Sequence, residues 1–165
     1  MAATDDEVDL IIDAWARQRP DIDFAPLDVF SRLRRIARRL DAVRGAAFGR
    51  SELDTWEFDV LSTLRRSGEP YQLSPKHLVT ATMVTSGTMT NRVDRLVARG
   101  LVERRVDPND GRGVVVQLTD DGLQRVDQAM LDLVQAEEER LADLTPQQQA
   151  QLGGLLRRLN EGFPS

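Results

Sequence analysis

TSGTMTNRVDRLVARG (residues 85–100) begins with small hydroxyl residues and a glycine, and it then carries an asparagine and three arginines. At 100° per residue its large apolar side chains fall in one arc, which is the pattern of a buried helix face. Thr, Asn and Arg side chains, which donate to base edges and phosphates, lie roughly opposite. The stretch therefore predicts a DNA-reading helix, with a solvated face bearing ordinary surface arginines as the alternative. The outward residues are Thr88, Asn91, Arg95 and Arg99.

The flanking segments favour the DNA-reading alternative. Ser74-Pro75 is a helix cap followed by a first-turn proline, so a helix is expected to begin there and to end at the turn MVTS (83–86). After the second helix come two short β-branched runs, 101–106 and 114–119, separated by the turn-rich sequence DPNDGRG. A helix–turn–helix followed by a hairpin is a winged helix, whose second helix enters the major groove while the hairpin reaches the backbone.

Charge is unevenly distributed along the chain. The whole protein carries a net charge of −5, from 22 basic and 27 acidic residues, whereas residues 85–113 carry six arginines and four acids. This segment is therefore locally positive, and the local field is what meets a phosphate backbone. Arg104, Arg105 and Arg112 bracket the hairpin tip, which suits phosphate or minor-groove contact.

Helices are expected on both sides of the winged helix. Residues 4–19 have one apolar stripe and a capping-box spacing between Thr4 and Glu7, and residues 26–48 have two apolar stripes. Residues 55–66 form the helix that precedes the helix–turn–helix.

Two further helices are predicted after the hairpin, beginning at Thr119 and Thr145. Their apolar stripes, within 123–141 and 152–159, could be intramolecular core. A small winged-helix body would leave them poorly buried, however, so a dimer interface is the favoured interpretation.

Several classes of protein are excluded or disfavoured by the sequence. The chain has no cysteine, no signal-peptide pattern and no long apolar run, so we expect a cytoplasmic protein without a membrane span. His77 is the single histidine and has no ligand-spaced partners, so no metal site or cofactor is expected. No nucleophile–base pair or phosphate-binding loop is present, and an enzyme is therefore not expected.

The chain resembles the MarR family of bacterial transcription regulators from about residue 26 to 161. WEFDVLSTLRRSG (56–68), the helix–turn–helix segment (73–105) and DPNDGRGVVVQLTDDG (107–122) carry the resemblance. The resemblance implies a homodimer on a palindromic operator, usually a repressor, often released by a small anionic or phenolic ligand. The family's wing often reads D-x-R-R; here Arg112 is kept and the next residue is Gly113, which puts a second wing contact in doubt.

The resemblance extends to the urate-responsive (PecS/HucR-like) subgroup of that family. AWARQRPDIDFAPLDVF (14–30), GEPYQLSP (68–75) and TSGTMTNRVDRL (85–96) are similar to it. The subgroup implies ligand response at a tryptophan, an aspartate and an arginine. Their matching positions here are Trp15, Asp59 and Arg92.

The residues themselves give this ligand site a physical basis. Arg92 lies at the edge of the apolar arc and Asp59 borders apolar neighbours, so each charge is expected to seek a partner. An Asp59–Arg92 ion pair would join helix 55–66 to the DNA-reading helix, and an anion on Arg92 would compete with it. The alternatives are a purely structural ion pair and, for Trp15, a plain core position.

The sequence thus predicts a mainly α protein with a small β-hairpin wing, a winged helix–turn–helix domain flanked by N- and C-terminal dimerisation helices. Residues 1–50 are assigned to dimerisation and ligand sensing, 51–119 to DNA binding and 120–165 to dimerisation. The expected partners are an operator duplex, a second copy and a small effector such as urate. A regulator answering a different phenolic effector, or a protein-interaction module, is the alternative. The predicted DNA-binding residues are Ser86, Thr88, Thr90, Asn91, Arg95, Arg105 and Arg112.

Overall fold

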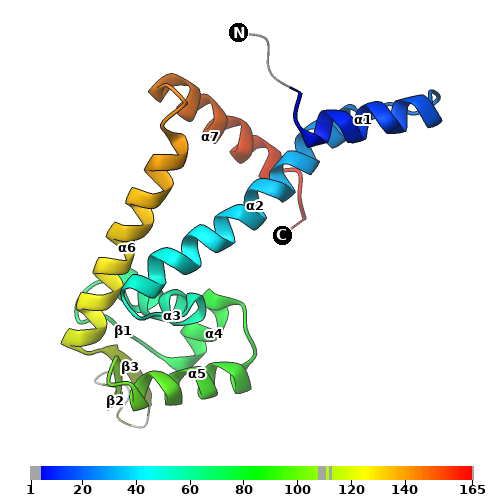
Figure 1. The fold of residues 1–165 in the computed structure, drawn as a ribbon. Coiled ribbons are helices and arrows are strands. Elements are labelled where there is room, and N and C mark those ends of the chain that lie inside the picture. Colours follow the sequence, from blue (N-terminus) through cyan, green and yellow to red (C-terminus); the bar gives the residue numbers. More distant parts are fainter. Residues whose placement is uncertain (1–4, 108–110, 112, 165) are drawn as a thin grey trace. The chain divides into compact units, whose positions relative to one another are not determined.

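The structure is a computed structural model that describes residues 5–107, 111 and 113–164. Its contacts divide the chain into two units, one ending at Arg44 and one beginning at Gly45. The elements in chain order (Figure 1) are α1 (Glu7–Gln18), α2 (Ala25–Arg50), α3 (Thr55–Arg66), β1 (Gln72–Leu73), α4 (Pro75–Thr82), α5 (Ser86–Ala98), β2 (Val102–Val106), β3 (Val114–Leu118), α6 (Asp120–Leu141) and α7 (Pro146–Asn160).

The N-terminal unit contains α1 and most of α2. A capping box starts α1: the Asp6 carboxylate accepts from the Val8 amide at 2.7 Å, and the Asp9 carboxylate accepts from the Asp6 amide at 2.7 Å. The predicted capping by Thr4 and Glu7 is therefore wrong, because a carboxylate two residues later caps the helix instead. Thr4 itself lies outside the described residues.

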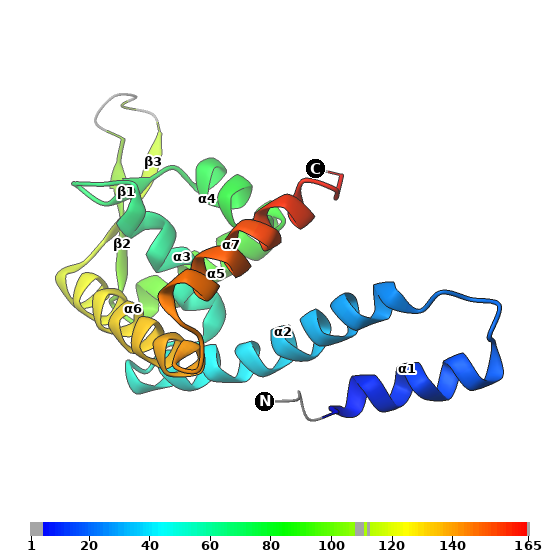
Figure 2. The ribbon, with the colours of Figure 1, turned by 90° about the horizontal axis from the view of Figure 1, so that it is seen from above.

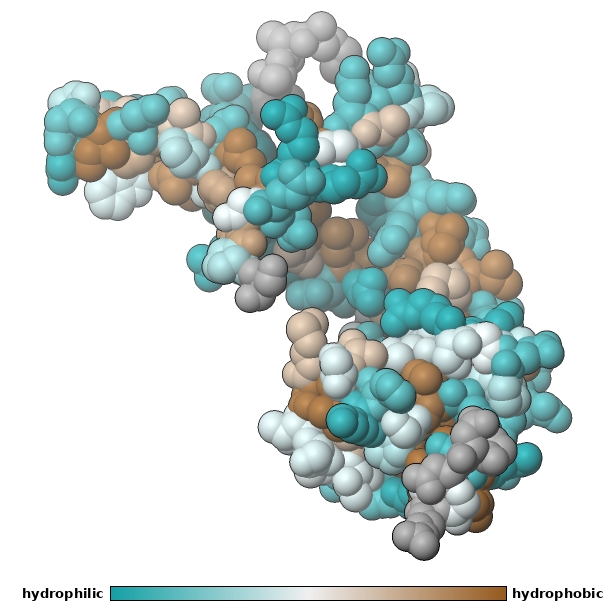
Figure 3. All heavy atoms as spheres, turned by 180° about the vertical axis from the view of Figure 1, so that it is seen from behind, coloured by the Kyte–Doolittle hydropathy of each residue, from teal (hydrophilic) through white to brown (hydrophobic). Residues whose placement is uncertain are grey.

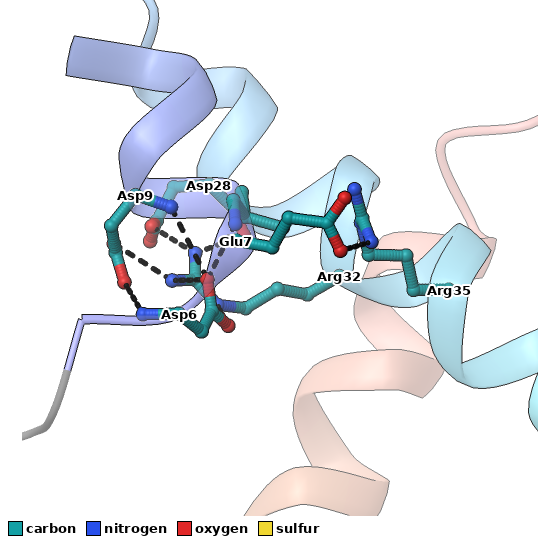
Figure 4. A network of polar contacts seen from close by, with 7 residues as sticks. Asp6, Glu7, Asp9, Asp28, Arg32 and Arg35 are labelled. Carbon is teal, nitrogen blue, oxygen red and sulfur yellow. Dashed lines mark hydrogen bonds and ion pairs between the residues drawn. The ribbon is translucent and has the colours of Figure 1, made fainter.

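Ion pairs join α1 to α2 within this unit (Figure 4). The Arg32 guanidinium of α2 points toward the first turn of α1, where it donates to Asp6 at 3.0 Å and Asp9 at 2.8 Å. It also pairs with Asp28 on its own helix, and Arg35 pairs with Glu7. We call Asp6, Asp9, Asp28 and Arg32 the Arg32 cluster.

The second unit is built around one hydrophobic core. The rings of Phe48, at the end of α2, and Phe58, in α3, stack with centroids 4.0 Å apart. Side chains from α4, α5, the strands and α6 complete the core, and burying each large one contributes roughly 1.5–3 kcal/mol. The largest fully buried apolar members are Phe48, Leu61, Leu64, Leu78, Met89, Leu96 and Leu101.

The sheet has three antiparallel strands in the order β1-β3-β2. β2 and β3 form the predicted hairpin, with Val102 opposite Leu118 and Val106 opposite Val114. The two-residue strand β1 was not expected; it pairs with the outer side of β3, where Leu73 lies opposite Val116 (Figure 2). The mainly α fold with a winged helix–turn–helix is confirmed.

The DNA-reading helix predicted from the sequence is α5, and both of its ends are fixed by local chemistry. Thr85 caps it, since the Thr85 hydroxyl accepts from the Thr88 amide at 3.2 Å. At the other end Gly100 adopts φ +70°, which glycine accepts without strain, and the Leu101 amide donates back to the Leu96 carbonyl at 3.0 Å. This turn directs the chain from α5 straight into β2.

The start of α6 is tied to the end of α5. Thr119 caps α6 as predicted, since its hydroxyl accepts from the Gly122 amide at 3.0 Å. The same hydroxyl donates to the Gly100 carbonyl at 2.7 Å. The predicted start of the last helix at Thr145 is also confirmed, since Thr145 caps α7 in a capping box with Gln148.

Candidate nucleic-acid interface

The polar residues predicted to read DNA lie exposed on α5. Ser86, Thr88, Thr90 and Asn91 are all exposed, and no acidic residue occupies the first turn. Two of the hydroxyl groups already have local partners. The Thr88 hydroxyl lies 2.9 Å from that of Thr85, and the Thr90 hydroxyl donates to the Ser86 carbonyl at 3.0 Å. The Thr90 hydroxyl therefore already donates its hydrogen bond within its own helix.

Arg99, at the end of α5, has structural partners in α3 and in the turn before it. Its guanidinium pairs with the Glu57 carboxylate of α3 and donates to the Glu52 carbonyl at 2.7 Å. The Glu57 side chain is only 2% exposed, so this ion pair is buried on the acid side. Arg99 is exposed as expected, but a carboxylate in the first turn of α3 and a carbonyl in the turn before it already engage its guanidinium.

The wing arginines are paired with nearby acids. Arg104 of β2 donates to Asp94 of α5 at 2.6 Å, which joins the wing to the DNA-reading helix. Arg105 donates to Glu103, two residues before it, at 2.8 Å. A phosphate would have to displace Glu103 to gain those donors. Arg112, the third predicted wing contact, lies outside the described residues.

Arg92 and Arg95 differ from the other arginines of this segment because both lie over one aromatic ring. The guanidinium carbon of Arg95 is 4.7 Å from the Trp56 ring centroid, and that of Arg92 is 5.6 Å away. Neither side chain donates a hydrogen bond to another described residue. An open hollow of about 510 Å³ lies at this point, and it is lined by Trp56, Gly87, Thr88, Asn91, Arg92 and Arg95.

The structure does not form the expected ion pair within the predicted ligand site. No ion pair joins Asp59 to Arg92, both of which are described; Arg92 contacts Trp56 instead. Asp59 is half-buried, and its carbonyl accepts from the Thr63 hydroxyl at 2.7 Å. Trp15 belongs to the N-terminal unit, where it is 51% exposed and stacks on Phe24 with centroids 6.1 Å apart.

Sequence reasoning missed the two residues of α3 that organise α5. Trp56 and Glu57 stand in its first turn, and together they contact Arg92, Arg95 and Arg99, which lie at i, i+3 and i+7 on α5. The capping-box spacing of Asp54 and Glu57 predicts the start of α3. It does not predict the contacts that this turn makes with α5.

Two further features are absent from the described part of the chain. It contains no group of three or more His, Asp or Glu side chains placed to hold a metal ion. None of the helices within it is long and apolar enough to cross a membrane.

The fold and this face define a winged helix–turn–helix regulator of transcription. A family model described as the MarR family matches residues 51–113, and the chain is 35% identical over 155 residues to the transcriptional regulator PecS of Dickeya dadantii, covering 94% of this chain and 93% of PecS. The protein belongs to the MarR family of DNA-binding transcription regulators, and it resembles the PecS subgroup.

Solved structures agree with this assignment. A mutant MarR from E. coli in complex with operator DNA superposes with a TM-score of 0.66 at 28% identity, covering 84% of this chain and 99% of MarR. BpsR of Bordetella bronchiseptica, whose DNA binding is regulated by 6-hydroxynicotinic acid, gives 0.65 at 30% identity, covering 82% and 94%. These relatives are regulators and not enzymes, which confirms the predicted class.

Proposed function

We propose that this protein is a homodimeric repressor that binds a palindromic operator and is released from it by a small aromatic anion such as urate. One observation carries the DNA-binding part: α5 exposes Ser86, Thr88 and Asn91 beside two arginines that donate to no other described residue. We assign residues 51–119 to DNA binding, with Arg105 and Arg112 on the wing as further phosphate contacts. Residues 1–50 and 120–165 would then serve dimerisation, the former also ligand sensing.

The proposed effector-binding residues are Arg92 and Asp59 of the second unit, and Trp15 of the N-terminal unit is proposed separately as a residue of the ligand response. Arg92 supports this site because its guanidinium pairs with no acid among the described residues and lies over an aromatic ring. An aromatic anion would find both a charge and an aromatic surface there. The aromatic acid named for the relative BpsR makes a second phenolic or pyridine-type effector the next candidate to try.

DNA binding is tested by fluorescence anisotropy on a labelled duplex carrying the intergenic DNA beside the protein's own gene. We expect log K to fall linearly with log salt, with a slope of about 0.9 per neutralised phosphate. Arg95→Ala should weaken binding about tenfold. Arg140→Ala, which removes an exposed arginine of α6, is the matched control and should leave the affinity unchanged.

A protein-interaction module would give no duplex binding at low salt on this or other candidate DNA, and that result would overturn the proposal. Unchanged affinity in Arg95→Ala would instead remove only this residue from the interface.

Ligand response is tested by adding urate to the preformed complex. Release by urate, blunted in Arg92→Ala at unchanged fold, is the expected result. Release that is as complete in Arg92→Ala as in the wild type would contradict the proposed effector site. Release by a phenolic acid but not by urate would keep the regulator and replace its effector.

A further inference from the structure

Trp56 lies under the two arginines of α5 that are free to contact DNA. We propose that Trp56 is a positioning residue for DNA binding: its ring holds the Arg92 and Arg95 guanidinium groups so that their edges face the phosphate backbone. The inference rests on the proposed role of Arg95 in DNA contact. It adds a residue of α3, outside the helix–turn–helix, to the machinery of recognition.

Contact with the ring is compatible with donors that remain available on both arginines. A planar guanidinium offers its face to an aromatic ring and its five N–H groups around its edge, so ring contact and phosphate contact are compatible on one side chain. The separations of 4.7 Å for Arg95 and 5.6 Å for Arg92 lie within the range of cation–π attraction. Trp56 therefore orients these groups without consuming a single donor.

The neighbouring arginines differ from Arg92 and Arg95 in having acidic partners. Arg99, Arg104 and Arg105 each donate to a carboxylate, and those donors must be freed before they can reach a phosphate. Arg92 and Arg95 need no such exchange. An arginine that is held in place before binding also loses less conformational freedom when DNA arrives, which favours the complex.

The ring itself is held by a rigid part of the fold. The Trp56 indole N–H donates to the Asp54 carboxylate at 3.2 Å, and its ring packs against the buried core. Asp54 caps α3, and Glu57, the residue after Trp56, is the buried partner of Arg99. The first turn of α3 thus fixes α5 through Arg99 and presents Trp56 to the two arginines nearer its start.

The test is a double-mutant cycle on the labelled intergenic duplex, with Trp56→Leu, Arg95→Ala and the double variant, each checked for fold by circular dichroism. We expect Trp56→Leu to weaken binding about fivefold, and Trp56→Phe, which keeps an aromatic face, about twofold. The double variant should lose less affinity than the sum of the two single effects, because Trp56 acts in part through Arg95.

Two readouts separate positioning from a loss of charge or fold. Trp56→Leu should keep the salt dependence of the wild type, whereas Arg95→Ala should lower the slope by about one phosphate. In a Trp15→Phe background Trp56 is the sole tryptophan, since the chain has two. Its emission should change in Arg95→Ala, and bound DNA should protect it from acrylamide.

The outcomes distinguish this inference from the proposed function. If Arg95→Ala weakens binding while Trp56→Leu does not, or if the two effects simply add, Trp56 has no positioning role and the regulator proposal stands. Unchanged binding in Arg95→Ala removes the contact on which the inference depends, and overturns it together with that assignment. A Trp56 that acrylamide quenches equally with and without DNA overturns it as well.

Discussion

At the scale of single residues, Glu57 is the acid whose environment matters most. It is 1% exposed, and its carboxylate accepts from the Asp54 amide at 2.9 Å and pairs with Arg99. A buried charge is tolerated when it is paired and hydrogen-bonded, and both conditions hold here. One side chain therefore caps α3 and anchors the end of α5.

Removing the partner of that carboxylate should be costly. Arg99→Ala leaves Glu57 buried with one backbone donor, and we expect the free energy of unfolding to fall by about 3 kcal/mol. Arg104→Ala is the matched control, because the Arg104–Asp94 pair is solvent-exposed and is worth about 0–1 kcal/mol. Urea unfolding followed by circular dichroism measures both. Equal midpoints for the two variants would contradict a structural role for Arg99.

At the scale of elements, the joint between α5, β2 and α6 depends on a glycine. A Cβ built on Gly122 would lie 2.0 Å from the Leu101 carbonyl oxygen, a backbone atom that cannot turn away. The close approach lets the first turn of α6 pack against the segment leaving α5. Movement of α6 and of the DNA-reading helix is therefore sterically linked at this point.

Gly122→Ala should separate these elements. We expect a loss of about 1–3 kcal/mol in stability from overpacking, together with weaker duplex binding because α5 shifts. Gly154→Ala in α7 is the control: nothing lies within 4 Å of its Cβ, so the alanine should be neutral or stabilise the helix by up to about 1 kcal/mol. Thermal unfolding of both variants decides the matter. A Gly122→Ala protein as stable as the Gly154→Ala protein would contradict the close contact.

The contact between α1 and α2 is predicted to depend on pH and salt. The hydrogen bond from Arg35 lowers the pKa of Glu7. The pKa of Asp9 is lowered mainly by the hydrogen bond from the Asp6 amide and next by that from Arg32. In the folded state the pKa values of Glu7 and Asp9 lie below their ordinary values of 4.5 and 3.8. These contacts therefore contribute their full stability to the folded state when the pH is above the ordinary values. They are lost as pH falls through the lowered values, so α1 should stay docked at neutral pH and loosen below about pH 4.

Hydrogen exchange of α1 measures this contact directly. Arg32→Ala should speed exchange in α1 at neutral pH, because it removes the ion pairs to Asp6 and Asp9. Arg19→Ala is the matched control, since Arg19 pairs only two residues away with Asp21 and does not join the two helices. If the two variants exchange alike in α1, the Arg32 cluster does not hold the helix.

Local chemistry explains which elements could be predicted from the sequence. The starts at Thr119 and Thr145 follow from capping, and the hairpin follows from two β-branched runs. β1 could not be found, because its two residues are a strand only through pairing with β3, far along the chain. For the same reason a helical wheel placed Arg99 on the outer side: it gives an angle around α5 but not the neighbour that α3 supplies.

At the scale of the whole molecule, the single chain leaves apolar surface unburied (Figure 3). α7 has no buried residue, and hydrophobic side chains of α6 and α7 remain exposed: Leu131 is 65% exposed and Leu155 61%. Exposed apolar faces of this kind usually mark an interface between chains. Together with the one winged helix in the described part of the chain, they fit the proposed dimer on two half-sites.

Loss of the proposed dimer should weaken DNA binding. Leu155→Glu places a charge in the apolar stripe of α7, and we expect sedimentation velocity to show a shift from dimer to monomer. Duplex affinity should fall more than tenfold, and the salt slope should fall by about half, because a monomer neutralises half as many phosphates. Gln147→Glu, which adds the same charge to the exposed first turn of α7, should leave both unchanged. If the Leu155→Glu protein stays dimeric, α7 is not part of the interface. If it is monomeric and still binds the duplex with wild-type affinity, a single winged helix suffices for recognition.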